Sequence, residues 1–359
     1  MSYVSSASSA ILVRGSDVLP KPLAWMWEGW LCAGKMHLLA GAPGTGKTTI
    51  AVALSAIVTA GSNWPDGTKA QQGSVAFWSG EDNNADTLNP RLRAAGADMN
   101  RVFVVDGLNV RGERRPFDPA LHISALREEL IKIPHLRVLV IDPIVSAVAG
   151  DSHKTAETRR SLQPLVDLAE ELGCALVGIT HFNKGTKGQD TLERLTGSAA
   201  FGAFTRVVLV AARQCAKDGS QERRVLVRLK SNIGPDGDGY VYDVQEGDLL
   251  EFPGVKASSV MWGEPVFGAA RDLLAETSPR DRNPKSKNLA SWLRDLLSAG
   301  PLSAEELRVH CDKNGYAMRT VNHALKKEKE MGNIVFKRVG FPSHGIWALP
   351  GSEKPIEEF

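Results

Sequence analysis

Short apolar runs alternate with helical patterns along most of the chain. The runs occupy residues 36–40, 74–78, 101–105, 138–141, 175–179, 207–211 and 224–229. Helical periodicity appears between several of them, at residues 48–60, 85–95, 123–131 and 159–172. Strands rich in Val, Ile and Leu that alternate with helices are typical of a parallel sheet covered on both faces. We therefore expect an α/β core with a doubly wound, mostly parallel sheet, which the later, closely spaced runs finish as antiparallel pairs.

The pattern changes after residue 277. Residues 278–287 (SPRDRNPKSK) lack large apolar side chains, which is typical of a linker. Beyond them, three helices and two strands are predicted at 288–299, 303–314, 318–330, 334–339 and 345–349. Ser303 and Glu306 form a capping-box pattern at the start of the second helix. This order predicts a small winged helix-turn-helix-like domain, with the hairpin as the wing.

These observations predict five segments. They are an N-terminal Trp-containing segment packing on the core (1–35), the α/β core (36–277), the linker (278–287), the winged-helix-like domain (288–350) and a tail (351–359). In the first segment, Trp25 and Trp27 project to one side if the chain is extended, whereas Trp30 points the other way unless the chain turns at Gly29. Core packing is the favoured interpretation of these rings, and a platform for stacking bases is the alternative.

Composition narrows the class of protein. The chain has 359 residues, 43% apolar and 23% charged, which is ordinary for a globular protein and excludes collagen-like and disordered chains. No apolar run reaches the ~18 residues that span a bilayer, and the N-terminus lacks the pattern of a secretory signal. Cysteines are scattered, at Cys32, Cys174, Cys215 and Cys311. We expect reduced thiols in a cytoplasmic protein without a membrane partner.

Charge is unevenly distributed. The net charge is +2, but residues 282–338 hold 12 Lys or Arg and 6 Asp or Glu. This excess predicts an anionic partner for the C-terminal domain, with a solvated helix face as the alternative.

The clearest chemical signal is a phosphate-binding loop between a predicted strand and a predicted helix. Residues 41–48 fit G-x-x-x-x-G-K-[ST] in full. Backbone N–H groups of such a loop point at phosphates, and the following helix presents its positive end. Lys47 is expected to bridge the β- and γ-phosphates, and Thr48 to bind Mg²⁺. The predicted nucleotide-binding residues are Gly41, Ala42, Pro43, Gly44, Thr45, Gly46, Lys47, Thr48 and Thr49.

Three other strand ends supply candidate chemistry. Asp142 ends a buried run and is expected to orient Mg²⁺. Glu81 follows the run at 74–78 and is the preferred base for activating water, with Asp82 as the alternative. His181 follows the run at 175–179, where it either senses the γ-phosphate or is an ordinary histidine at the edge of the core.

Together these residues resemble the RecA/DnaB-type motor ATPases, and within them the RepA-type replicative DNA helicases of plasmids and other mobile elements. The resemblance covers about residues 11–250. It rests on motifs in sequence order: Trp25-x-Trp27, GAPGTGKTT (41–49), Ser-Gly-Glu81-Asp, Pro90 to Asp98, Val-Ile-Asp142-Pro, Thr-His181-Phe-Asn-Lys184, Leu-Thr-Gly197 to Arg206, and Leu-Lys230-Ser-Asn232. We expect no primase-binding or loader-binding domain at the N-terminus.

The resemblance implies roles for these residues. Glu81 corresponds to the catalytic base and His181 to a sensor that links the nucleotide to DNA-facing loops. Arg206 corresponds to an arginine finger that reaches the nucleotide of the adjacent subunit, and Lys230 also faces that nucleotide. A ring, most simply a hexamer, is therefore expected, with ATP and Mg²⁺ bound between subunits.

DNA contacts are expected in two places. In the resembled family, loops after the Asp142 and His181 strands line a channel for single-stranded DNA. Here these are residues 146–160 and 183–198, and ordinary surface loops are the alternative. The third helix of the C-terminal domain is expected to contact duplex DNA, or else the domain docks a protein. The candidate DNA-binding residues are Lys154, Arg159, Arg160, Lys184, Lys187, Arg319, Lys326 and Lys327.

The leading hypothesis is a ring-forming, ATP-hydrolysing DNA helicase or translocase for replication of a mobile element. One alternative is a recombinase-like ATPase that binds DNA without unwinding it. Another is a nucleotide-gated DNA-binding regulator.

Overall fold

The central feature of the structure, a computed structural model, is one large sheet. The structure describes residues 10–152, 154–181, 199–214, 223–275, 284–314, 316, 318–339 and 344–352. Within these ranges nine strands form the sheet in the order β13-β12-β11-β10-β3-β9-β8-β4-β5. Their bounds are β3 (Met36–Gly41), β4 (Ser74–Ser79), β5 (Val102–Val104), β8 (Leu136–Asp142), β9 (Ala175–His181), β10 (Val207–Gln214), β11 (Arg223–Ser231), β12 (Gly237–Asp248) and β13 (Lys256–Val266).

The direction of the strands divides the sheet into two parts. Every neighbouring pair from β10 to β5 is parallel. The pairs from β10 through β13 are antiparallel. The expected mostly parallel sheet with antiparallel completion is therefore present. The apolar runs did not reveal β12 and β13, because these long strands mix Gly, Asp, Glu and Ser with their apolar residues.

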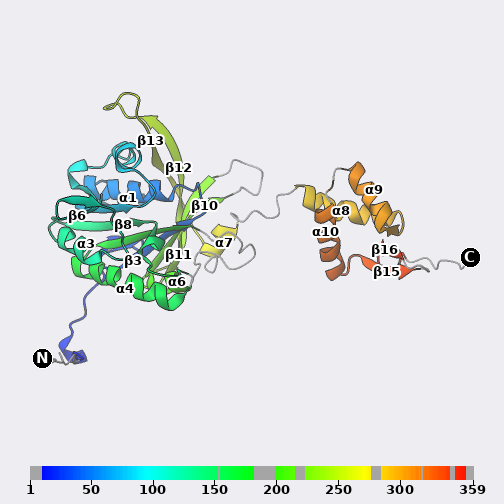
Figure 1. Cartoon of the computed structure of the whole chain (residues 1–359), viewed down its shortest axis with the longest axis horizontal. Coiled ribbons are helices and arrows are strands. Elements are labelled where there is room, and N and C mark those ends of the chain that lie inside the picture. The colour runs from blue at the N-terminus through cyan, green and yellow to red at the C-terminus, as the bar shows by residue number, and fades with distance from the viewer. Residues whose placement is uncertain are drawn as a thin grey trace, which may run out of the picture. The chain divides into compact units, whose positions relative to one another are not determined.

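Helices cover both faces of the sheet (Figure 1). On one face lie α1 (Lys47–Ala60) and α2 (Asn89–Ala94), and on the other α3 (Ile123–Leu130), α4 (Thr155–Leu172), α6 (Ala199–Phe204) and α7 (Ala270–Ala275). Strand β4 shows the alternation that this requires. Val75 and Phe77 are buried in the hydrophobic cluster that contains the residues of α1, whereas Ala76 and Trp78 are buried in the cluster that contains the residues of α4. The arrangement is a three-layer, doubly wound α/β domain.

Two helices begin differently from their predicted bounds. Helix α4 begins at Thr155, four residues before the predicted start, so Arg159 and Arg160 are helical rather than in a loop. Glu157 in its first turn favours this earlier start, because a carboxylate is stabilised at a helix N-terminus. The segment predicted as a helix at 85–95 begins as a π-helical turn, η2 (Asn84–Leu88), before α2.

The tryptophan segment is part of the core from Trp25 onward. It forms β1 (Trp25–Trp27) and β2 (Leu31–Cys32), with a turn in which Gly29 has a φ of 74°. The turn brings Trp30 onto Trp27 with ring centroids 4.6 Å apart, and Trp64 stacks on Trp27 at 5.2 Å. Trp27 is only 1% exposed, so its ring packs in the core and offers no stacking surface to a base.

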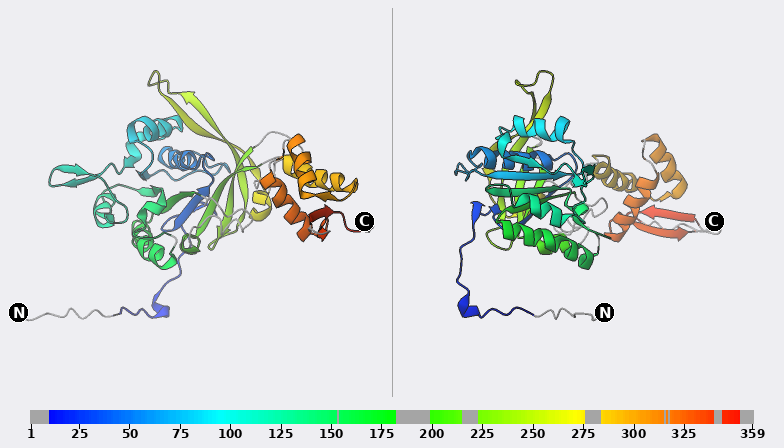
Figure 2. Two further views of the ribbon diagram at one scale, coloured as in Figure 1. Left: turned by 45° about the vertical axis from the view of Figure 1, so that its right-hand side comes forward. Right: turned by 60° about the vertical axis from the view of Figure 1, so that its left-hand side comes forward.

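Residues 10–24 behave differently from the tryptophan segment that follows them. They are exposed throughout, with one short 3₁₀ turn, η1 (Gly15–Asp17), and extend away from the domain (Figure 2). In the described part of the chain, every helix is too short or too polar to cross a lipid bilayer. Cys32, Cys174 and Cys311 are buried free thiols.

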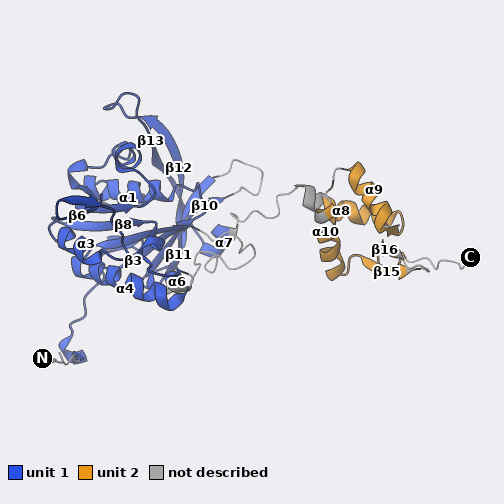
Figure 3. Ribbon diagram, in the orientation of Figure 1, with its two compact units in different colours: residues 1–278 blue, residues 279–359 orange. Residues whose placement is uncertain are grey.

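Contacts divide the chain into residues 1–278 and residues 279–359 (Figure 3). The second unit contains α8 (Pro284–Ser298), β14 (Leu302–Ser303), α9 (Ala304–Lys313), α10 (Met318–Glu330), β15 (Val335–Val339) and β16 (His344–Ala348). Its strands pair in the antiparallel order β14-β16-β15. Leu289, Leu293, Leu307 and Leu325 are buried in its own core. Ser303 and Glu306 form the predicted capping box, and α8 begins inside the segment predicted as a linker.

Several short elements lie in the connections of the first unit. They are η3 (Met99–Arg101), the hairpin β6 (Leu108–Val110) and β7 (Glu113–Arg115), and η4 (Ile144–Ala147). The pattern did not predict them, because they are too short to show a periodicity.

Candidate nucleotide site

The candidate residues meet where the parallel strands end, which we call the carboxyl edge of the sheet. Gly41 of β3 pairs with His181 of β9, and Ser79 of β4 pairs with Asp142 of β8. Because the paired strands are parallel and end at paired residues, the residues that follow them lie at the same edge of the sheet. The four strand ends that the sequence singled out are therefore neighbours.

Two glycines show why the loop at residues 41–48 has its composition. A Cβ at Gly41 would lie 2.2 Å from the carbonyl oxygen of Ala211 on β10. Gly46 has a φ of 86°, and a Cβ there would lie 3.0 Å from Val244 Cγ2. Only glycine accepts both the close approach and the left-handed backbone. Helix α1 begins directly afterwards, at Lys47, so its positive end faces the loop.

Thr48 and Asp142 form the best-defined contact of the site. Thr48 Oγ1 donates to Asp142 Oδ2 at 2.7 Å, although 94 residues separate them in the sequence. The pKa of Asp142 is raised to about 6, mainly by burial; nearby Glu81 and Asp82 also raise it, while the Thr48 hydrogen bond and Lys47 lower it. Two hard oxygen ligands near the carboxylates of Glu81 and Asp82 fit Mg²⁺, so Thr48 and Asp142 are the residues that would hold it.

Lys47, the first residue of α1, is buried beside the loop. Its Nζ donates to the carbonyl oxygen of Ala42 at 3.1 Å. Burial lowers its pKa, and the carboxylates of Asp142 and Glu81 oppose that change. Around it, Ala42, Pro43 and Gly44 form an exposed rim, and Thr45 and Thr49 are buried. The lysine is therefore held beside the loop that phosphates are expected to occupy.

Glu81 and His181 face each other across the site. Glu81 Oε1 lies 3.9 Å from His181 Nε2, and their side chains are 56% and 43% exposed. Burial lowers the pKa of His181, and the charge of Lys47 lowers it further, while Glu81 opposes this. Asp82, the alternative base, is instead bound by Arg91, whose Nη1 lies 2.5 Å from Asp82 Oδ2. Glu81 is thus the better placed of the two carboxylates to meet a water molecule.

Arg206 and Lys230 lie at the opposite end of the strands, which we call the amino edge. The N–H of Arg206 donates to the carbonyl oxygen of Met36, at the start of β3, and its side chain is exposed. Five residues of strand, about 17 Å, separate this point from Gly41. Lys230 Nζ donates to Gly202 O of α6 at 2.7 Å. The structure therefore does not bring these two residues to the phosphate loop of their own chain.

Two residues that the sequence did not reveal contact the loop. Arg213 Nη2 donates to Gly44 O at 3.0 Å, and the Tyr242 hydroxyl donates to Thr45 O at 2.5 Å. Arg213 lies near the end of β10, which borders the parallel and antiparallel parts of the sheet, and Tyr242 lies within β12. The one available signal was the position of Arg213 at the end of an apolar run that begins next to Arg206.

The candidate DNA-binding residues of the first unit are only partly described. Lys154 forms an ion pair with Glu157 at 3.0 Å. Arg159 stacks over the ring of Phe204, with its Cζ 5.3 Å from the centroid. Arg160 is exposed in α4. Lys184 and Lys187 lie outside the described residues.

In the second unit, Lys326 and Lys327 are exposed on α10. Lys329 on the same helix lies over the ring of Phe336 at 5.6 Å. The side chain of Arg319 lies outside the described residues. A basic surface is therefore present on the helix predicted to contact DNA.

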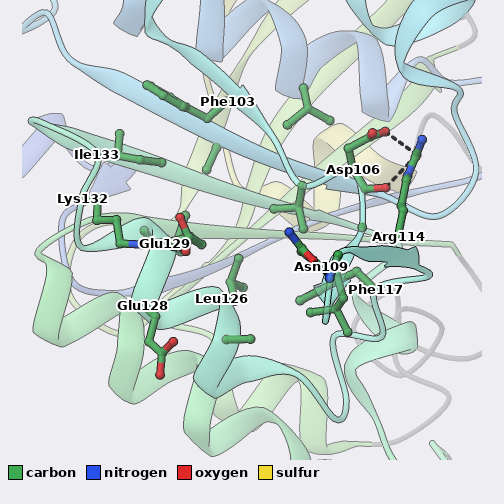
Figure 4. Close-up of a pocket in the computed structure, with 18 residues that line it drawn as sticks. Phe103, Asp106, Asn109, Arg114, Phe117, Leu126, Glu128, Glu129, Lys132 and Ile133 are labelled. Carbon is green, nitrogen blue, oxygen red and sulfur yellow. Dashed lines mark hydrogen bonds and ion pairs between the residues drawn. The ribbon is translucent and has the colours of Figure 1, made fainter.

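A separate cavity of about 750 Å³ opens beside β5 (Figure 4). It is bounded by β5, the β6–β7 hairpin and α3, with Leu126 and Ile133 among its apolar lining. Asp106 and Arg114 form an ion pair of 2.9 Å at its margin. None of the predicted nucleotide-site residues lines it, so this cavity is distinct from the phosphate loop.

Comparison with known proteins agrees with the site. The sequence model of the AAA domain family matches residues 5–187, just over half of the chain. The matched span includes the phosphate loop, Glu81, Asp142 and His181. An AAA domain is a P-loop ATPase domain, which binds nucleotide, typically with Mg²⁺. Among curated proteins, no significant match to the chain was found.

Proposed function

The chain belongs to the AAA domain family, and from this premise we propose that it is a ring-forming DNA helicase or translocase. In this proposal it hydrolyses ATP at interfaces between subunits, moves along single-stranded DNA and serves replication of a mobile element. The ring is proposed to be a hexamer.

Each residue of the carboxyl edge has a defined role in this reaction. Loop N–H groups and Lys47 bind the phosphates, and Thr48 and Asp142 hold the cation. Mg²⁺, when bound, neutralises charge on the β- and γ-phosphates. Glu81 accepts the proton of the attacking water. His181, 3.9 Å from Glu81, responds to the γ-phosphate and transmits its presence to the segment that follows β9.

The observation that carries the proposal is the separation of Arg206 from its own phosphate loop. The backbone of Arg206 is about 17 Å from Gly41, beyond the reach of its side chain, and the guanidinium is exposed. On the side of the loop where Glu81 lies, Arg91 is bound by Asp82. In the proposed ring, an arginine from an adjacent subunit adds positive charge at the γ-phosphate in the transition state, a contribution of about 10³–10⁵ in rate in other phosphoryl-transfer enzymes.

Mixing two inactive variants tests this arrangement. Lys47→Ala and Arg206→Ala are each expected to abolish most hydrolysis. In a random equimolar mixture, about a quarter of head-to-tail interfaces combine an intact phosphate loop with an intact Arg206, so activity returns. Steady-state phosphate release measures the recovery. A mixture that stays as inactive as its components contradicts the proposal.

A matched control mixes Lys47→Ala with Glu81→Gln. Both residues belong to the carboxyl edge of one chain, so neither subunit provides a complete loop and base. This mixture is expected to remain inactive at any ratio. Recovery here would mean that the loop and the base come from different subunits, which contradicts the placement of Glu81 beside its own loop.

Strand displacement separates the helicase from a recombinase-like ATPase. A helicase is expected to unwind a forked duplex, and its ATPase is expected to rise with single-stranded DNA. Hydrolysis stimulated by DNA without any displacement favours the recombinase-like alternative.

The basic surface of the second unit favours a second candidate, a nucleotide-gated DNA-binding regulator. Its order of helices and strands supports a winged helix, and Lys326, Lys327 and Arg338 are exposed. Footprinting with the full chain tests it: protection of one specific duplex sequence, changed by ATP, favours the regulator. Lys326→Glu with Lys327→Glu is expected to remove that protection.

A further inference from the structure

The carboxyl end of β10 extends past the point where β3 turns into the phosphate loop. The two strands are parallel, and Ala211 pairs with Gly41, the first residue of the loop. Strand β10 continues to Gln214, so Arg213 lies alongside the loop itself. Its Nη2 donates to Gly44 O at 3.0 Å.

From this geometry we infer that Arg213 is a nucleotide-binding residue that contacts the diphosphate part of the nucleotide from within the same chain. The inference rests on the proposed function, because it assumes that a nucleoside triphosphate occupies the loop. It adds a second cation to Lys47 and assigns it to the α- and β-phosphates, while Lys47 and His181 face the γ-phosphate and Glu81 faces the attacking water.

The order of strands determines which phosphates Arg213 can meet. On one side of β3, β9 ends at His181, β8 ends at Asp142, and Glu81 follows β4. These residues are the ones expected to face the γ-phosphate, its cation and the attacking water. On the other side lies β10 with Arg213. In the inferred placement, a triphosphate whose γ end points toward Asp142 directs its α-phosphate toward β10. The planar guanidinium then meets phosphate oxygens, for which its geometry is suited.

Neighbouring residues hold this part of the sheet against the loop. Arg213 pairs with Arg224 on β11, and Arg224 pairs with Tyr242 on β12, so the three side chains share one face. Tyr242 donates to Thr45 O at 2.5 Å, while Arg224 is bound by Asp243 at 2.5 Å. Of the two arginines, only Arg213 is thus directed to the loop by a hydrogen bond among the described contacts.

Lys47 makes a similar contact with the loop. Its Nζ also donates to a carbonyl of the loop, Ala42 O at 3.1 Å, and it is the residue expected to bind phosphate. A guanidinium has five N–H donors. Arg213 can therefore donate hydrogen bonds to the loop and to a phosphate at the same time.

Equilibrium binding of a fluorescent ADP analogue and a non-hydrolysable ATP analogue to the full chain tests the inference. Arg213→Gln is expected to weaken both by about tenfold, since it removes a charge-assisted hydrogen bond at a partly solvated site. Arg213→Lys keeps the charge and is expected to fall between wild type and Arg213→Gln. The affinity of Arg213→Gln is also expected to depend less steeply on KCl concentration, which loss of packing alone would not cause.

Arg223→Gln is the matched control. Arg223 is next to Arg224 on β11 but faces the other side of the sheet, where its Nε donates to Gln214 Oε1 at 2.6 Å. Its ADP affinity is expected to equal that of wild type. Thermal unfolding of all variants shows whether they are folded.

Three results overturn the inference or its premise. Wild-type ADP affinity in Arg213→Gln, with binding lost in Lys47→Ala, overturns the inference alone. Weaker binding of the ATP analogue but not of ADP assigns Arg213 to the γ-phosphate and overturns the placement. Failure of the wild-type chain to bind either nucleotide overturns the proposed function, and with it this inference.

Discussion

The two edges of the central sheet hold their polar residues in different ways. At the carboxyl edge, contacts within the chain fix the side chains: Thr48 to Asp142 at 2.7 Å, and Lys47 to Ala42 O at 3.1 Å. At the amino edge, hydrogen bonds hold the backbone of Arg206 on both sides, to Met36 O and from Asn232 N, while its side chain is exposed. At the carboxyl edge, the polar side chains are held by contacts within the chain, whereas at the amino edge the charged side chain of Arg206 is exposed to solvent.

This difference separates functions that one subunit can perform from those that need two. Strand β3 joins the two edges and is about 17 Å long. A side chain at one edge therefore does not reach the other edge of the same chain. Nucleotide binding is therefore expected in a single subunit. Rapid cleavage, in the proposed ring, depends on an amino edge from a neighbour.

Among the variants that test the difference between the two edges, Glu81→Gln is expected to change the hydrolysis rate most. In Glu81→Gln, nucleotide affinity is expected to persist, because Lys47, Thr48 and Asp142 are intact. Hydrolysis is expected to fall by about 10²–10⁴, the usual contribution of a general base. Single-turnover phosphate release and ADP binding measure the two properties separately.

Asp82→Asn provides the control for this assignment. Asp82 is bound by Arg91 at 2.5 Å, so its loss is expected to affect the turn after β4 and to slow hydrolysis less. If Asp82→Asn removes hydrolysis and Glu81→Gln does not, the two carboxylates have the opposite roles.

At the amino edge, His37 is expected to make stability depend on pH. It is fully buried in β3, and Nε2 accepts the N–H of Cys32 at 3.0 Å. Burial lowers its pKa from 6.5 to about 4, so below pH 6.5 the unfolded chain binds this proton before the folded chain does. Stability is therefore lost as the pH falls from 6.5 toward 4, by up to about 3 kcal/mol from this group.

Urea unfolding between pH 8 and pH 5 checks the contribution of His37. His37→Gln keeps a hydrogen-bond acceptor and is expected to be less stable at pH 8, with a shallower loss toward pH 5. His135→Gln changes an exposed histidine and is expected to follow the wild-type profile. An equally steep loss in His37→Gln assigns the acid sensitivity to other groups.

Local patterns in the sequence were sufficient to predict which residues lie together at the carboxyl edge of the parallel strands. The glycines of the loop, and the acidic residue or histidine after each apolar run, are signals within a few residues of each strand. The parallel sheet then requires such strand ends to be close together. For this reason Lys47, Thr48, Asp142, Glu81 and His181 could be grouped before their contacts were known.

Other features depend on pairing between distant segments and could not be predicted in this way. Tyr242 reaches Thr45 across 197 residues, through the register of three antiparallel strands. Arg213 meets Gly44 because β10 is longer than β3, which no local pattern records. The start of α4 was misplaced because residues 155–158 lack large apolar side chains and carry little hydrophobic periodicity.

Tyr242→Phe is expected to give the smallest effect, and it tests how far the antiparallel strands support the loop. Burial raises the pKa of Tyr242, so its hydroxyl remains a donor to Thr45 O across the neutral range. Removing it leaves a loop carbonyl with one partner fewer and is expected to cost about 1 kcal/mol of unfolding free energy. ADP affinity is expected to fall by a few-fold, less than in Arg213→Gln.

Tyr240→Phe is the control for that variant, because Tyr240 lies two residues away on β12 and packs against Trp27 at 5.7 Å rather than against the loop. Urea unfolding with and without ADP distinguishes the two positions. Tyr242→Phe is expected to lose part of the stabilisation that ADP provides, whereas Tyr240→Phe keeps it in full. Equal ADP stabilisation in both variants means that β12 packs beside the loop without supporting its nucleotide-binding conformation.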